Sequence, residues 1–81
     1  MAGLAKTEAE IQERLSRFLK AELKRANVTY AELAERLSKH GLKAETEASV
    51  KNKLARGTFA ASFLVASLAA LELEGIALCA I

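Results

Sequence analysis

The residues best able to do chemistry in this chain are small, polar and basic side chains that alternate within one short segment. They are Ser49, Lys51, Asn52, Lys53 and Arg56. An asparagine can make a bidentate contact with adenine, an arginine can bind guanine or phosphate, and a lysine pairs with phosphate. The segment therefore makes double-stranded DNA a candidate partner, with Ser49 and Asn52 nearest the bases.

A second candidate contact lies earlier in the chain, at Thr29 and Tyr30. These residues open a predicted helix, and the backbone amides at a helix start can hold a phosphate. Each candidate also has a plainer interpretation. Thr29 is a helix cap, Tyr30 lies on the core-facing stripe, Ser49 can satisfy first-turn amides, and the basic residues can form a solvated face.

Other kinds of chemistry find little support in the residue types. The chain has one histidine, His40, and one cysteine, Cys79, whereas a zinc site needs four clustered ligands. No Ser-His-Asp set, glycine-rich phosphate loop or HExxH pattern is present. We therefore expect no catalytic residue, no metal and no cofactor, and we expect that the protein is not an enzyme.

Composition and capping patterns predict the elements that position these residues. Proline is absent, glycine is scarce and helix-forming residues dominate, so the 81 residues are predicted to form one all-α domain over 1–81. Capping boxes start at Thr7 and Thr29, and Asn27, Gly41 and Gly57 are natural stops. The predicted elements are helices at about 8–26, 30–40, 47–56 and 59–73, with an extended tail at 74–81.

Hydrophobic spacing indicates which helix faces are buried. In the third predicted helix only Val50 and Leu54 point inward, which leaves a wide polar face for a partner. The fourth is apolar nearly all round, which predicts a central position or a homodimer formed through this helix and the tail. Glu22 falls inside the apolar face of the first helix, and we expect it to pair with an arginine of another helix.

Charge is unevenly distributed, although the net charge is only +2. Basic residues gather in the middle of the chain and acidic residues at its two ends, which favours one anion-facing surface. The N-terminal segment is charged and lacks the apolar core of a signal peptide. The apolar run at 59–71 is shorter than the roughly 20 residues of a membrane span. We therefore expect a cytoplasmic protein without a membrane partner.

The segment 19–71 resembles the repressor/Cro-type helix-turn-helix fold. Residues 23–34 are similar to that family's first helix, tight turn and second-helix opening, with Leu33 and Ala34 in place of its usual Leu-Ala pair. Residues 54–57 resemble the end of its third helix. The resemblance implies a compact four-helix, lambda-repressor-like domain whose helix at 47–56 enters the major groove. One departure is the link at 41–45, because the family's turn has only three or four residues.

The whole chain also resembles a short, uncharacterised bacterial domain family that shares the stretches 24–34 and 52–59. That family has no established activity, so this resemblance supports the fold more than a function. Two hypotheses follow. The first is a small transcriptional regulator that binds DNA as a homodimer. The second is a helical protein-interaction module that uses the fourth helix and the tail and does not bind DNA.

Overall fold

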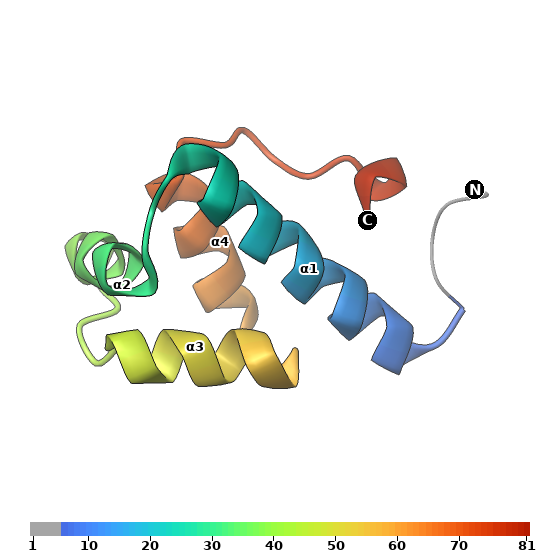
Figure 1. Ribbon diagram of the computed structural model, residues 1–81, viewed down its shortest axis with the longest axis horizontal. Helices are drawn as coiled ribbons and strands as arrows, with labels where there is room; N and C mark the ends of the chain where they lie inside the picture. The colour runs from blue at the N-terminus through green and yellow to red at the C-terminus, as the bar shows by residue number, and fades with distance from the viewer. Residues whose placement is uncertain (1–5) are drawn as a thin grey trace.

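The computed structural model describes residues 6–81, and this part of the chain contains four α-helices and no β-strand. They are α1 (Glu8–Ala26), α2 (Tyr30–Lys39), α3 (Glu47–Arg56) and α4 (Ala61–Ala70), followed by the short 3-10 helix η1 (Leu78–Ala80) (Figure 1). The all-helical prediction is therefore confirmed. The first five residues of the domain expected over 1–81 lie outside the described residues.

Threonine residues cap the N-terminal ends of the first three helices. The hydroxyl oxygens of Thr7, Thr29 and Thr46 each accept a hydrogen bond from the backbone N–H three residues further on, at 3.1–3.2 Å. At α2 and α3 the side chain of that third residue also accepts a hydrogen bond from the threonine N–H, which completes a capping box. The N-terminal amides of these helices are therefore satisfied locally, independently of tertiary packing.

A residue with a left-handed backbone ends each of the four helices. These residues are Asn27, Gly41, Gly57 and Glu72, with φ between 58° and 93°. After α1, α2 and α4, the N–H of the next residue returns to a carbonyl five positions earlier, as in a Schellman motif. The helix predicted at 30–40 ends one residue earlier, at Lys39, because the chain leaves helical geometry at His40.

Gly57 also brings the end of α3 close to α1. A Cβ atom at this position would lie 3.2 Å from the backbone oxygen of Gln12, and the φ of Gly57 is +74°. Both conditions favour glycine, since it has no Cβ and adopts a left-handed backbone without strain. The spacing between α1 and the C-terminal end of α3 therefore depends on this residue.

The hydrophobic core lies where the four helices meet. Helix α2 packs against α3 and α4, and α1 packs against α3. The side chains that are almost completely buried come from all four helices: Leu19, Leu33, Leu37, Val50, Leu54 and Phe63. None of the helices of residues 6–81 has the length and apolar character needed to cross a membrane.

Helix α4 is shorter than the helix expected at 59–73. Phe59 and Ala60 precede the helix, with Ala60 extended, and the Phe59 ring packs 5.1 Å from that of Phe63. At the other end the chain turns at Glu72, and the Arg36 guanidinium donates a hydrogen bond to the carbonyl of Ala70 at 3.0 Å. Apolar periodicity continues beyond both points because the flanking residues still pack against the core.

The C-terminal tail runs back along α1 (Figure 1). It has no regular structure at 73–77 and then forms η1, so the extended tail expected at 74–81 is only partly extended. Arg14 of α1 donates a hydrogen bond to the carbonyl of Ile81 at 3.4 Å. The tail thus packs against the first helix of the same chain.

Glu22 does not pair with another helix as expected. Its carboxylate lies 3.3 Å from the guanidinium of Arg25, which is three residues further along α1. Only 13% of the Glu22 side chain is exposed, whereas Arg25 reaches well into solvent. A local i,i+3 pair therefore takes the place of the interhelical pair.

The left-handed conformation of Glu72 predicts a stabilising substitution. Glu72→Gly should raise the free energy of unfolding by about 0.5–1 kcal/mol, since relief of about 1–2 kcal/mol of left-handed strain outweighs the extra unfolded-state entropy of glycine. Urea denaturation measures the change. Glu74→Gly removes the same charge from an exposed residue without positive φ, and it should give no gain. Equal effects of the two substitutions would contradict the assignment of strain to Glu72.

Candidate functional site

Helix α3 presents a polar face to solvent because its core contact is narrow. Val50 and Leu54 are buried, while Lys51, Asn52 and Arg56 are exposed. Successive residues of a helix are rotated by about 100°, so these three side chains lie away from the buried stripe. Three of the five candidate residues in this segment are therefore free to meet a large partner.

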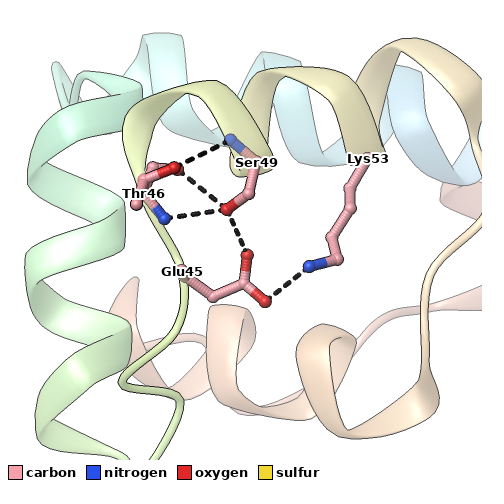
Figure 2. A network of polar contacts seen from close by, with 4 residues as sticks. All are labelled: Glu45, Thr46, Ser49 and Lys53. Carbon is pink, nitrogen blue, oxygen red and sulfur yellow. Dashed lines mark hydrogen bonds and ion pairs between the residues drawn. The ribbon is translucent and has the colours of Figure 1, made fainter.

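The other two candidates, Ser49 and Lys53, belong to a polar network that joins α3 to the two residues before it, Glu45 and Thr46 (Figure 2). The Ser49 hydroxyl accepts a hydrogen bond from the N–H of Thr46 at 2.8 Å and donates to the carboxylate of Glu45 at 2.6 Å. The second oxygen of Glu45 pairs with the Lys53 ammonium at 2.6 Å. One carboxylate therefore binds both side chains.

Burial and pairing act in opposite directions on Glu45. Burial raises the pKa of this carboxyl group. Hydrogen bonds from Lys53 and Ser49 and the charge of Lys53 lower the pKa by more than burial raises it, so the pKa lies below its ordinary value of 4.5. The Glu45 side chain is only 10% exposed. The carboxylate is thus ionised at neutral pH and holds its two partners as an acceptor.

Lys53 points toward α4 and away from the exposed face of α3. Its side chain is 27% exposed, and its ammonium lies 5.5 Å from the centroid of the Phe63 ring. A cation over an aromatic face is attracted to the ring as well as to the carboxylate. The geometry therefore gives Lys53 a positioning role on the inner side of α3, distinct from the exposed Lys51.

The link between α2 and α3, at 40–46, is attached at two points. The Leu42 side chain packs against the core, and its N–H donates to the carbonyl of Leu37 at 3.0 Å. Glu45 then binds α3 through Ser49 and Lys53. The longer link noted in the sequence thus has a defined course, and it sets the position of α3 relative to α2.

Thr29 and Tyr30 lie at the start of α2. The Thr29 hydroxyl takes part in the capping box with Glu32, and Tyr30 is half-buried against the core. These contacts match the plainer interpretation of both residues. The N-terminal end of α2 nevertheless lines a shallow hollow together with Lys20 and Lys24 of α1.

Sequence reasoning missed three contributors to this region. It treated 41–45 only as a link and gave Glu45 no role, although Glu45 organises Ser49 and Lys53. Lys20 and Lys24 belong to the basic middle of the chain, but the sequence pattern was not used to relate them to α3. The sequence spacing could have placed the two lysines together. Each follows a core leucine of α1, and the lysines are four residues apart, so they lie along one edge of that helix.

Two residues with other possible chemistry lie apart from this face. His40 is exposed at the end of α2, and Cys79 is an exposed free thiol in η1. Within residues 6–81, no three His, Cys, Asp or Glu residues are grouped as a metal site would require.

The lowered pKa of Glu45 predicts a pH-dependent contribution to stability. An ionised Glu45 stabilises the folded state fully above pH 4.5, and this contribution is lost as the pH falls through the lower pKa of the folded protein. Glu45→Gln should therefore cost about 1–2 kcal/mol at neutral pH. Denaturation at a series of pH values should show the difference from the natural protein shrinking below pH 4.5.

Glu47→Gln is the matched control for this experiment. Glu47 is exposed two residues further on, and its substitution removes the same charge from the same helix start. The two variants should differ clearly at neutral pH. A Glu45→Gln variant with unchanged stability would show that the network does not hold α3.

Comparison with known proteins adds one match. Residues 11–76 match the model of a family described as a domain of unknown function (DUF6471). No curated protein and no solved structure matches the chain. The matched region contains α2, α3, α4 and all but the first turn of α1, together with Glu45, Ser49 and Lys53. The chain therefore belongs to the DUF6471 family.

Proposed function

We propose that this protein binds double-stranded DNA and acts as a small transcriptional regulator. The exposed face of α3, with Lys51, Asn52 and Arg56, is the observation that carries the proposal. In this proposal α3 enters the major groove, Asn52 contacts a base edge, and Arg56 contacts a guanine or a phosphate. Lys51 binds the backbone, which positions the helix without reading sequence.

The contacts that hold α3 in place support a role for this helix in DNA binding. A recognition helix must be held in one orientation, because base contacts tolerate little displacement. Here Val50 and Leu54 bury one side of α3, while Glu45 holds Ser49 and Lys53 on a neighbouring side. In the proposal, α2, the link at 40–46 and α3 serve as a helix-turn-helix unit with a long turn. Ser49 and Lys53 then position α3, and Thr29 and Tyr30 flank it.

A homodimer fits the proposal because two copies can read two half-sites. Paired modules gain both affinity and specificity when their recognition helices lie about one helical turn of DNA apart. The proposed interface is the outer side of α4 together with the tail. Val65 of α4 is 64% exposed, and Leu78 of the tail is 46% exposed.

The proposal predicts that DNA recognition depends on the exposed side chains of α3. Replacing both Asn52 and Arg56 with alanine should abolish sequence-specific binding, with a loss of about 1–3 kcal/mol for each base contact removed. Both residues are exposed, so folding should be unaffected. The measurement is fluorescence anisotropy on a duplex selected from a random library, with thermal denaturation of each variant.

A matched control replaces two exposed residues of α2, Ser38 and Lys39, with alanine. This double variant changes charge by the same amount as the α3 variant. Its affinity for the selected duplex should stay close to that of the natural protein. Specific binding that survives the α3 substitutions would exclude these side chains from recognition.

A second candidate function is a protein-interaction module that does not bind DNA. The exposed Val65 favours it, because α4 carries no charged residue and its outer side exposes apolar and small residues. Such a surface suits a partner helix or a second copy of the chain. The two candidates differ in the surface that they use, since DNA binding depends on α3 and partner binding on α4.

Self-association through α4 predicts a strong effect at its most exposed apolar residue. Val65→Lys should convert a dimer to a monomer, because a charge at the centre of an apolar interface has no partner there. Sedimentation equilibrium measures the mass of each variant. Ser38→Lys adds the same charge to the exposed side of α2 and should leave the dimer intact. A natural protein that is monomeric at high concentration would exclude this interface.

A further inference from the structure

An open groove of about 420 Å³ runs between α1 and the C-terminal half of α3. Its floor contains the small or apolar residues Ala9, Leu54 and Ala55. Basic side chains approach it from both helices, Arg17 and Lys20 from α1 and Arg56 from α3. The groove thus combines a shallow floor with cationic edges, and it lies beside the exposed face of α3.

A buried hydroxyl lines this groove without a partner. Ser16 is 5% exposed, and its Oγ atom forms no hydrogen bond. A buried hydroxyl without a partner costs free energy, and its presence in a native structure asks for an explanation. The Ser16 side chain lines the groove, so rotation about its χ1 angle would turn the hydroxyl toward a polar ligand seated there.

The basic edge continues along α1 toward the start of α2. Lys20 also lines the neighbouring hollow of about 430 Å³, together with Lys24 and Thr29. Lys20 and Lys24 are one helical turn apart, which is about 6 Å along the helix axis. One strand of duplex DNA carries a phosphate about every 3.4 Å of axis, so a span of about 6 Å covers nearly two phosphate steps and lets the two lysines reach two phosphates of the same strand.

Acidic residues weaken only part of this edge. Glu13 forms an ion pair with Arg17 and offsets its charge. Glu47 lines the hollow near Lys20 and Lys24 and is exposed. Lys20, Lys24 and Arg56 form no ion pair within the described residues. The remaining positive charge therefore lies along α1 and at the end of α3.

We propose that this edge of α1 binds the phosphate backbone of the same duplex whose bases α3 reads. Lys20 and Lys24 pair with two phosphates of one strand, and the Ser16 hydroxyl, once rotated toward the groove, donates a hydrogen bond to a phosphate oxygen. This inference rests on the proposed function and extends it. The two helices then have different roles, because α1 contributes affinity that does not depend on DNA sequence and α3 contributes sequence specificity.

The salt dependence of DNA binding tests the inference. Each phosphate contact contributes about −0.9 to the slope of log affinity against log salt. Replacing both Lys20 and Lys24 with alanine should reduce the magnitude of this slope by about 1.8. Affinity for mixed-sequence and selected duplexes should fall by the same factor. Lys39→Ala, on the exposed side of α2, controls for the loss of a positive charge and should leave the slope unchanged.

Ser16→Ala provides an independent readout. Removing a buried hydroxyl without a partner should leave the melting temperature unchanged or raise it, whereas a hydroxyl that binds phosphate should cost about 3- to 10-fold in DNA affinity when removed. The combination of retained stability and weaker binding supports the inference. A variant with unchanged affinity would show that Ser16 takes no part.

The outcomes separate this inference from the proposed function. If the natural protein binds a selected duplex and the double lysine variant keeps the full slope, the inference is overturned while the function of α3 stands. If the variant loses slope and retains its preference for the selected duplex, the inference is supported. Absence of duplex binding by the natural protein at low salt would overturn both.

Discussion

The position of α3 depends on one carboxylate, that of Glu45, which lies between a hydroxyl and an ammonium group. Taking this charge out of water is unfavourable, and Lys53 and Ser49 compensate by hydrogen bonding to both of its oxygens. The arrangement is directional in a way that hydrophobic contacts are not. Val50 and Leu54 hold α3 against the core, and the polar network sets its rotation and its distance from the link at 40–46.

The network also determines which side chains of α3 remain available. Because Glu45 holds Lys53 on the side of α4 and Phe63, Lys53 does not share the surface of Lys51. The Ser49 side chain and N–H likewise form hydrogen bonds with Thr46 at the start of α3. The same helix thus has a structural side and an exposed side, and a substitution on the structural side would affect the exposed side only by moving the helix.

Local signals in the sequence were sufficient for much of the fold, whereas the site needed tertiary information. The capping box at Thr29 and the stops at Asn27, Gly41 and Gly57 involve residues within a few positions of one another, so they can be read directly. At Thr7 the helix starts as predicted, but the structure shows only the threonine cap and not the return hydrogen bond from Glu10 that a capping box requires. The end of α4 could not be predicted from the sequence, because a glutamate rarely adopts the left-handed conformation of Glu72. The turn is also stabilised by a hydrogen bond from Arg36 of α2, which is far away in the sequence. The pairing of Glu45 with Lys53 joins a link residue to a helix residue eight positions away, a spacing that no local rule favours.

The ion pairs of the molecule determine which of its positive charges remain without a close acidic partner, although the net charge of the chain is only +2. Within the described residues, Arg17, Arg25 and Lys53 are paired with glutamates, so their charges are largely offset. The glutamates of these three pairs are Glu13 and Glu22 of α1 and Glu45 of the link before α3. The cations left outside these pairs include Lys20, Lys24 and Arg56, which border the grooves along α1 and α3. Net charge therefore understates the local potential, since the distribution of partners and not the total determines where an anion is attracted.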